Sequence, residues 1–395
     1  MQKANGGFLI NILLALAIAH GINDGMQSLV ISNYAVIKEH LNLTYTQIGI
    51  IAFVYQFSSS LLQPAFGYLF DRKPIVWLLP FGQISTMIGL LLIAYGNSMN
   101  VMLLAVFFAG MGSAILHPLA AKMTSLSAGN RKGFAQSIFQ LGGTVGFSLG
   151  PLLAALVVRD LSDIAKLSVV AIFAFIILIP SCRWYNAELL KPKPKKSSEV
   201  VMLNDVILTK FKITAIFSLL IFLIFSKNFY LTSFSYYYTF YLMEKFAMSL
   251  ANAQLLLFIF LFSNAIGLLL GGIVSDKYGR KMVICLSFVC SAPFALIMPY
   301  ASLAGTVILS VIIGLIISSA FSAILLYAQA LMPSRVGFVS GVFFGVAFGF
   351  AAISSAALGK IADLKGIDFV YHLCAFMPLL GIFGFLLPKI RNLKR

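Results

Sequence analysis

Four polar residues lie close together inside the first long apolar run, which covers residues 8–37. They are His20, Asn23, Asp24 and Gln27, and on an α-helix this spacing brings them to one face. No other acidic residue lies as deep in an apolar segment. An ionisable side chain in hydrocarbon is costly, so we expect Asp24 to face a bundle interior or an aqueous cavity and to be functional. The alternative is that Asp24 only holds a contact between helices.

The chemistry these residue types suit is proton binding. Asp24 lies about 16 residues into its run and Lys227 about 15 residues into the run 212–242, so at 1.5 Å per residue both fall near the bilayer midplane. We expect Asp24 to be the proton site and Lys227 its partner or a cation that binds an anionic substrate, because protonating the carboxylate would release the lysine. A static counter-ion is the alternative for Lys227. His20 and His117 have the titration range of proton relays, although each could equally be a neutral, hydrogen-bonded histidine.

Polar and aromatic side chains at helical spacing predict the lining of a cavity. Aromatic side chains in a stripe more often serve packing or the membrane interface, so only a few tyrosines are predicted to bind substrate. The predicted substrate-binding residues are Asn23, Gln27, Tyr55, Gln56, Gln63, Gln136, Gln140, Asn228, Tyr230, Tyr237 and Tyr238.

The composition is that of an integral membrane protein. Hydrophobic residues make up 60% of the 395 residues and charged residues only 10%, whereas soluble domains carry about 25% charge. The apolar runs are about 20 residues or longer and lack the alternation of outer-membrane strands, which predicts helices. The four cysteines are scattered without metal-ligand or disulfide spacing, so we expect no metal site.

The apolar runs predict twelve transmembrane helices joined mostly by short loops. The predicted spans are 8–37, 46–70, 75–95, 100–126, 133–158, 164–185, 212–242, 249–274, 282–300, 304–331, 336–359 and 368–388. The predicted fold class is therefore an all-α integral membrane protein.

The basic residues predict the topology. With the N-terminus inside, 21 of the 28 Lys and Arg residues fall on the inner side of these spans and six on the outer side, while Lys227 lies within a span. Because positive charge concentrates on the cytoplasmic side, both termini should be cytoplasmic. The net charge of +16 is explained by this asymmetry, so we expect no nucleic-acid partner.

A polar connection divides the chain into two halves of six spans. We predict an N-terminal bundle at 1–185, a cytoplasmic linker at 186–210 and a C-terminal bundle at 211–395. The segment Gly67-Tyr-Leu-Phe-Asp71 recurs as Gly272-Ile-Val-Ser-Asp276 at an offset of 205 residues, and the same offset relates Asn23 to Asn228. The halves are therefore predicted to be parallel repeats around a central cavity with the substrate site near the midplane.

The two loops resemble the signature of the major facilitator superfamily, which lies between spans 2 and 3 and again between 8 and 9. The resemblance implies a cytoplasmic gate, in which a glycine lets helices approach and an aspartate and basic residues form a latch. The predicted gate residues are Gly67, Asp71, Arg72, Gly272, Asp276 and Arg280. Small residues at Gly142, Gly146 and Gly150-Pro151 resemble the span-5 motif of proton-linked antiporters and favour export over uptake.

Further motifs resemble the fosmidomycin resistance branch of this superfamily. They are His20-x-Ile-Asn-Asp24, Tyr55-Gln56, Leu61-Leu-Gln63-Pro64, His117-Pro118, Gln136-Ser-x-Phe-Gln140, Gly150-Pro-Leu-Leu-Ala154 and Ser235-Tyr-Tyr-Tyr-Thr-Phe-Tyr241. The resemblance implies a monomeric bacterial inner-membrane exporter driven by the proton gradient without a cofactor, with a phosphonate antibiotic among the family's substrates. One position departs from the pattern, because the family commonly has an acidic residue and then an arginine where this chain has Leu119 and Lys122.

We therefore expect a proton-coupled secondary transporter working by alternating access, most readily a drug/proton antiporter that exports a small polar or anionic compound. The alternative is a symporter that imports a small nutrient, organic anion or metal chelate. An intramembrane enzyme is disfavoured because the spans supply no paired acid, metal cluster or nucleophile with its base, and no P-loop indicates a pump. A sensor is disfavoured because the short tails leave no room for an output domain.

Overall fold

The computed structural model describes residues 9–73, 75–128, 132–190, 210–332 and 336–388. Within these residues the secondary structure is helical, with no strand. The chain divides into two compact units, one made of residues 1–193 with 249–258 and the other of residues 194–248 with 259–395. Most of the predicted linker lies outside the described residues, and α9 continues to Leu189, so the linker stays a prediction.

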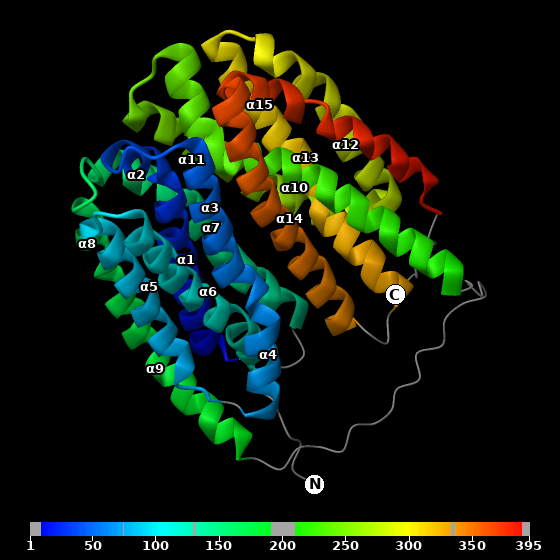
Figure 1. The fold of residues 1–395 in the computed structure, drawn as a ribbon. Helices are drawn as coiled ribbons and strands as arrows, with labels where there is room; N and C mark the ends of the chain where they lie inside the picture. Colours follow the sequence, from blue (N-terminus) through cyan, green and yellow to red (C-terminus); the bar gives the residue numbers. More distant parts are fainter. Residues whose placement is uncertain (1–8, 74, 129–131, 191–209, 333–335, 389–395) are drawn as a thin grey trace. The chain divides into compact units, whose positions relative to one another are not determined.

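The first unit contains the N-terminal helices (Figure 1). They are α1 (Ile10–Ser32), α2 (Tyr34–His40), α3 (Tyr45–Gln56), a π-helical turn (Phe57–Leu61), α4 (Gln63–Arg72), α5 (Leu78–Tyr95), α6 (Met99–Ser127), α7 (Lys132–Val157), α8 (Asp163–Ser168) and α9 (Val170–Leu189).

The second unit contains the C-terminal helices, although the first residues of α11 group with the first unit. They are α10 (Lys210–Phe246), α11 (Leu250–Tyr278), α12 (Arg280–Ile297), a 3-10 turn (Met298–Tyr300), α13 (Leu303–Leu331), α14 (Val336–Lys365), α15 (Ile367–Cys374) and a 3-10 segment (Met377–Leu386).

Each predicted span coincides with one helix or with two or three consecutive helical segments separated by at most two residues, which confirms the predicted all-helical membrane fold. Ten of these, counted among the described residues, are long and apolar enough to cross a membrane by composition alone. The helix α1 is not among the ten. This helix contains His20, Asn23, Asp24 and Gln27, and these polar residues lower the mean hydropathy of a helix that is otherwise apolar.

Local signals explain where several helices begin. Thr44 caps α3 and forms a reciprocal capping box with Gln47. The hydroxyls of Ser98 and Ser302 each accept an amide from the first turn of α6 and of α13. These caps satisfy amide groups that have no partner within the helix. Gly279, with φ of +92°, makes the tight turn that separates α11 from α12, a conformation that other residues rarely adopt.

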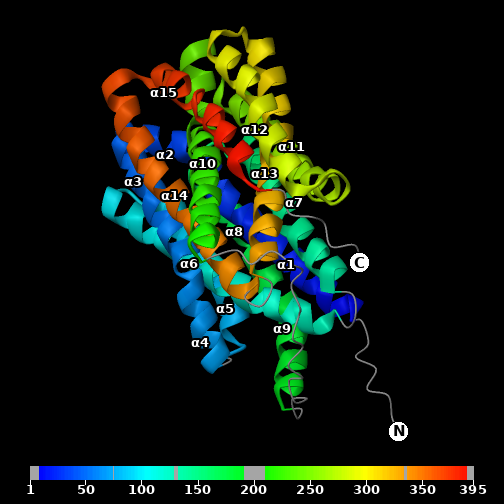
Figure 2. The same cartoon turned by 90° about the vertical axis from the view of Figure 1, so that its right-hand side faces the viewer.

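Helices α1 and α7 pack side by side through glycines (Figures 1 and 2). A Cβ atom added at Gly146 would lie 1.9 Å from the Gly21 carbonyl oxygen, and one at Gly142 would lie 2.2 Å from the Ala17 carbonyl oxygen. The backbones are therefore in direct contact, as small residues at every fourth position allow in membrane helices. This close contact fixes the height at which the polar face of α1 lies against α7.

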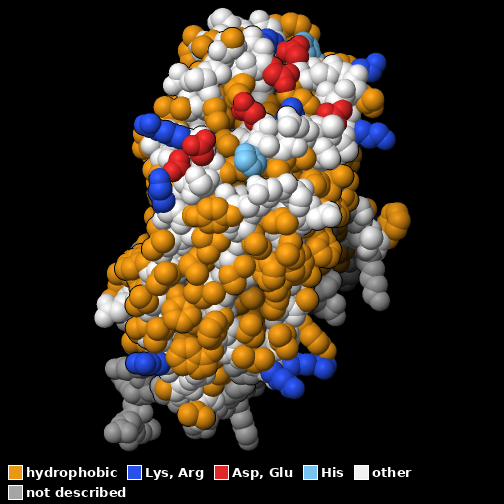
Figure 3. Space-filling view, turned by 60° about the vertical axis from the view of Figure 1, so that its left-hand side comes forward, with side chains coloured by type: hydrophobic (Ala, Val, Ile, Leu, Met, Phe, Trp, Pro, Cys, Tyr) orange, Lys and Arg blue, Asp and Glu red, His pale blue; other side chains and the backbone are white. Residues whose placement is uncertain are grey.

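The outer surface of the first unit suits lipid. Leu104, Phe81, Phe173 and Ile176 are about half exposed, at 50–58%, and a soluble protein would not leave so many large apolar groups facing water. On the face drawn in Figure 3, hydrophobic side chains cover the middle and charged side chains gather toward the two ends. This distribution is the one expected of helices that cross a bilayer.

Candidate functional site

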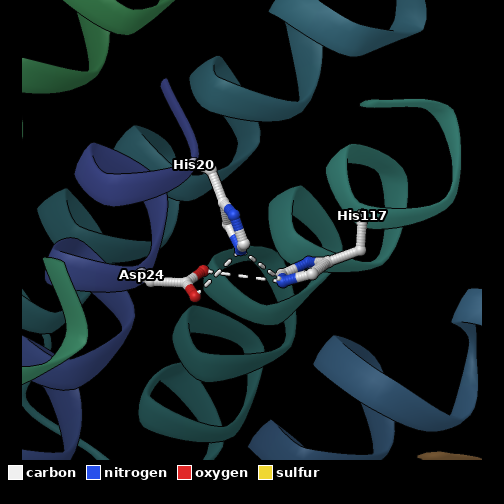
Figure 4. A group of neighbouring side chains, drawn as sticks. All are labelled: His20, Asp24 and His117. Atoms are coloured by element: carbon white, nitrogen blue, oxygen red, sulfur yellow. Dashed lines mark hydrogen bonds and ion pairs between the residues drawn. The ribbon is translucent and has the colours of Figure 1, made fainter. Parts of the chain in front are cut away.

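Three side chains meet inside the first unit: His20 and Asp24 from α1, and His117 from α6 (Figure 4). The His20 Nε2 atom lies 3.1 Å from Asp24 Oδ2 and 3.1 Å from the Nε2 atom of His117. The His117 Nε2 atom lies 3.7 Å from Asp24 Oδ1. We call these three residues the histidine–aspartate cluster. Its side chains are 3% (His20), 19% (Asp24) and 26% (His117) exposed, so His20 is buried and the other two are partly accessible.

Helix α7 holds the His20 ring in place. The His20 Nδ1 atom lies 2.8 Å from the carbonyl oxygen of Phe139, and the Phe139 ring stacks on the imidazole with the centroids 4.1 Å apart. One turn further on, Gly143 has no side chain that could occupy this space. A Cβ atom there would lie 2.4 Å from His20 Nε2 and 2.8 Å from Asp24 Oδ2. Gly143 therefore makes room for the cluster, whereas its neighbour Gly142 contacts the backbone of α1.

Helix α6 orients His117 through its own preceding turn. The Nδ1 atom of His117 lies 2.9 Å from the carbonyl oxygen of Ser113 and 3.1 Å from the Ser113 hydroxyl oxygen. The Ser113 carbonyl is thus engaged by a side chain, and the imidazole is directed at His20 and Asp24.

These contacts determine where protons sit in the cluster. A backbone carbonyl can only accept a hydrogen bond, so Nδ1 of His20 and Nδ1 of His117 both carry a hydrogen. Two neutral imidazoles would then present bare Nε2 atoms to each other and to the carboxylate of Asp24. Three acceptors separated by 3.1, 3.1 and 3.7 Å repel one another unless a proton lies between them. The geometry therefore calls for at least one proton shared among the two Nε2 atoms and the carboxylate.

The same donor set has the chemistry of a metal site. Imidazole nitrogens and a carboxylate oxygen bind divalent transition metals, and the ligand atoms of the three residues lie within 4.8 Å of one another. Two of the three separations equal a hydrogen-bond length, which a shared proton explains without a further component. The sequence prediction of no metal site stays a prediction.

Two of the predicted substrate-binding residues belong to the surroundings of this cluster. The side chain of Asn23 is fully buried and its Nδ2 atom donates to Asp24 Oδ1 over 3.0 Å. Gln27 is also buried, and its Nε2 atom donates to the carbonyl oxygen of Ala109 on α6 over 2.6 Å. Both amides therefore bind protein groups of the first unit, and Asn23 supports the proton site directly.

The other polar candidates of the first unit lie elsewhere. Tyr55 and Gln56 are buried at the end of α3, and Gln63 on α4 is half-buried, with its Nε2 atom donating to the Ser59 carbonyl across the π-helical turn. Gln140 on α7 is exposed, and the side chain of Gln136 lies outside the described residues. A role for these five in substrate binding stays a prediction.

Lys227 belongs to α10 of the second unit and is 6% exposed. Its Nζ atom lies over the Phe321 ring, 5.0 Å from the centroid, and it forms no ion pair with an acidic residue among those described. Asn228 is half-buried, and its carbonyl accepts the hydroxyl of Thr232. The predicted pair between Asp24 and Lys227 would join the two units and stays a prediction.

The predicted tyrosines lie in an aromatic core of the second unit. Tyr230 and Tyr238 are buried against Phe234, and Tyr371 contacts Tyr238. Tyr237 is fully buried and donates its hydroxyl to the carbonyl of Ser355 over 2.6 Å. In this structure the three tyrosines pack and brace helices, so contact with a substrate stays a prediction.

The predicted gate residues are only partly described, because the side chains of Asp71, Gly272 and Asp276 lie outside the described part. Arg72 is exposed, with its guanidinium 4.5 Å from the centroid of the Tyr68 ring, and Arg280 donates from Nη1 to the Leu326 carbonyl over 2.8 Å. An added Cβ atom at Gly67 would meet Pro118 at 3.6 Å, an ordinary contact. Close packing therefore does not require glycine at Gly67 in this conformation.

Leu119 takes the place of the acidic residue that the family commonly has after His-Pro. It is fully buried in an apolar core with Phe70, Val76 and Leu79. A carboxylate here would need a partner that this core does not offer. Leu119 therefore supplies no second carboxylate to the histidine–aspartate cluster.

Some parts of the cluster could not be read from the sequence. The i, i+4 spacing pairs His20 with Asp24, but His117 is 97 residues from His20, and no spacing rule connects them. The sequence also did not predict that Gly143 and the Phe139 carbonyl contact the cluster. The only available signal was the Gly142-Gly143 pair in a membrane helix, where two small residues in a row present two helix faces.

Comparison with known proteins agrees with this architecture. The family model described as Major Facilitator Superfamily matches residues 16–253 and 220–394. The chain is 47% identical over 394 residues to the Fosmidomycin resistance protein of Escherichia coli strain K12, covering 99% of this chain and 95% of that one. It is 36% identical to the Uncharacterized MFS-type transporter YfnC of Bacillus subtilis strain 168, covering 97% and 94%.

Solved structures share the fold. A bacterial homolog of the human lysosomal transporter Spinster, in an inward-facing and occupied conformation, superposes with a TM-score of 0.76 at 15% identity, covering 96% of each chain. The nucleoside transporter NupG superposes with a TM-score of 0.71 at 16% identity, covering 95% of this chain and 98% of that one. The family match, the near full-length relatives and the shared fold together show that the chain belongs to the Major Facilitator Superfamily of membrane transporters.

Proposed function

We propose that this transporter is a proton-coupled exporter that works by alternating access and expels a small polar or anionic compound, with fosmidomycin, a phosphonate antibiotic, as the first substrate to test. The proposal of export rests on 47% identity to a protein named for fosmidomycin resistance. The proposal of proton coupling rests on the histidine–aspartate cluster. In this proposal the transporter needs no cofactor, because the proton gradient supplies the energy.

The geometry of the histidine–aspartate cluster is the observation that carries the proposal. A carboxylate and two imidazoles meet in a buried place with both Nδ1 atoms directed at carbonyls. We infer that the remaining three acceptors share a proton. Histidine changes its charge between pH 5 and 8, the range across which a transporter exchanges protons. Alternating access would expose this group to one side of the membrane and then the other.

Lys227 is the proposed anion-binding group. A buried ammonium without an acidic partner among the described residues is costly in a membrane unless an anion reaches it. A phosphonate has the charge to do so. We further propose that the protein is a monomer of the bacterial inner membrane with both termini in the cytoplasm.

The experiment for proton coupling uses purified protein in liposomes. Uptake of labelled fosmidomycin, other phosphonates, sugar phosphates and cationic drugs is driven by an imposed pH gradient. It is compared with exchange of labelled for unlabelled compound at equal pH, which needs no net proton movement. We expect Asp24→Asn to keep exchange and to lose the response to the gradient, because an amide cannot take up the proton. An Asp24→Asn protein with a normal gradient response would refute the proton role.

The experiment for the anion site compares Lys227→Met with Lys227→Arg. Methionine keeps the apolar stem and removes the charge, so we expect exchange of anionic compounds to weaken at least about tenfold, the loss of one charge-assisted hydrogen bond. Arginine retains the charge and should keep most of the exchange. Equal exchange by Lys227→Met and the wild type would exclude Lys227 from the substrate site.

A further inference from the structure

Gln83 on α5 is a buried polar residue that the proposed function has not used. Its side chain is fully buried, and neither its Nε2 nor its Oε1 atom has a hydrogen-bond partner among the described residues. A buried polar atom without a partner costs about 1–3 kcal/mol. An amide with two such atoms therefore calls for an explanation.

Contacts on either side of Gln83 fix its height along the bundle. Below it, Leu79 packs in one core with Ala19 of α1 and Leu116 of α6. Above it, the hydroxyl of Thr86 lies 3.3 Å from the Ala109 carbonyl oxygen, the acceptor that Gln27 of α1 also uses.

Asn23 occupies the level on α1 that lies between these two contacts. It is one turn after Ala19 and one turn before Gln27, as Gln83 is one turn after Leu79 and three residues before Thr86. Residues that are three or four apart share a helix face. Helices α1 and α5 contact each other, and from this spacing we place Gln83 and Asn23 in the same layer between them.

The unbonded atoms in this layer complement one another. Asn23 Oδ1 and Gln27 Oε1 are buried acceptors without a donor among the described residues, and Gln83 Nε2 is a buried donor without an acceptor. A water molecule that accepted from Gln83 and donated to both oxygens would make three hydrogen bonds, the usual number for a buried water. The amides do not bond one another directly, because all three atoms lack a hydrogen-bond partner among the described residues.

We propose that Gln83 is a positioning residue for Asp24 and acts through Asn23, with a buried water bridging the amides. The Nδ2 atom of Asn23 donates to Asp24 Oδ1 over 3.0 Å. Rotating this amide by half a turn would place its oxygen against the carboxylate. A donor delivered to Asn23 Oδ1 opposes that rotation and keeps the hydrogen bond to Asp24 in place.

The inference rests on the proposed proton coupling, and its readout is the pH profile of gradient-driven transport. The titratable groups that face Asp24 are His20 from α1 and His117 from α6. Helix α5 has no Asp, Glu, Lys, Arg or His, and α7 presents the Phe139 carbonyl and Gly143. On α9, Arg183 is exposed, and Cys182 bonds the carbonyl of Val76.

The test is Gln83→Leu, a change that keeps the size and removes both amide groups. A hydrogen bond to a carboxylate favours its charged form. Loss of the ordered Asn23 donor should therefore make the cluster hold its proton to higher pH. We expect the half-maximal pH of gradient-driven transport to rise by about 0.5 to 1 unit, with exchange at equal pH unchanged. A profile that coincides with the wild type would overturn the inference.

The matched control is Thr124→Val on α6, two turns beyond His117, which removes a fully buried hydroxyl that also has no partner among the described residues. It should leave the pH profile in place. Gln83→Met is a second variant in case leucine does not fold. Adding Gln83→Leu to Asn23→Leu should cause no further shift, and additive shifts would show that Gln83 does not act through Asn23.

Running Asp24→Asn in parallel separates the two ideas. If Asp24→Asn retains the gradient response, the proposed proton coupling fails. If Asp24→Asn loses it while Gln83→Leu matches the wild type, only the role of Gln83 fails.

Discussion

The substitution Gly143→Ala tests the histidine–aspartate cluster without removing any of its members. The added Cβ atom would lie 2.4 Å from both Cε1 and Nε2 of His20 and 2.8 Å from Asp24 Oδ2. Contacts between nonbonded heavy atoms settle at about 3.5 Å, so the imidazole must move by about 1 Å. That displacement lengthens its 3.1 Å contacts with Asp24 and His117 beyond hydrogen-bond range.

We expect Gly143→Ala to remain folded, because the crowded atoms belong to side chains that can rotate. Gradient-driven transport should fall by about ten- to hundredfold, the usual cost of misplacing a reacting group by 1 Å. Exchange at equal pH should persist. The assays are gradient-driven uptake and exchange at equal pH in liposomes, as described above. Thermal unfolding of the purified protein reports whether the variant is folded.

Gly142→Ala is the matched control, being the same change one residue earlier. Its Cβ atom would meet the carbonyl oxygen of Ala17 at 2.2 Å, and a backbone cannot rotate away. It should lower the unfolding temperature and both transport activities together. If Gly143→Ala also lowered both activities equally, or neither, the assignment of the proton to this cluster would be refuted.

Two further predictions concern stability. Gly146→Ala places a Cβ atom 1.9 Å from the Gly21 carbonyl oxygen and should destabilise the protein by about 1–3 kcal/mol, the usual cost of overpacking. The measurement is the unfolding temperature in detergent, which should fall. An unchanged unfolding temperature would contradict direct backbone contact. Ser98→Ala removes the cap that accepts the Val101 amide and should cost about 1 kcal/mol, whereas Ser98→Asp should retain most of the stability in the same assay.

The sequence predicts the helices well because a bilayer imposes a simple rule on every span. The predicted span 304–331 becomes α13 at Leu303–Leu331, since apolar length alone decides where such a helix lies. The π-helical turn at Phe57–Leu61 was not predicted, because three consecutive serines read equally well as an ordinary helix. Local hydrogen bonds, such as that from Ser58 to the Tyr55 carbonyl, accompany this turn.

Only the part of the site that lies on a single helix could be predicted from the sequence. His20 and Asp24 follow from helical spacing, since residues four apart must be neighbours. The partnership with His117 depends on how α6 packs against α1, which the spacing of residues does not encode. Gln83 gave no signal either, because a lone glutamine in an apolar run is equally compatible with a lipid-facing or an interior position.

The glycine contact between α1 and α7 has a mechanical consequence. Because the backbones of α1 and α7 are in direct contact, we expect the two helices to move together as one rigid unit. His20 and Asp24 belong to this unit, whereas His117 belongs to α6. The proposed shared proton would therefore lie between two parts of the bundle that can move separately. A shift of α6 by a fraction of a turn would separate the two imidazoles and leave Asp24 beside His20.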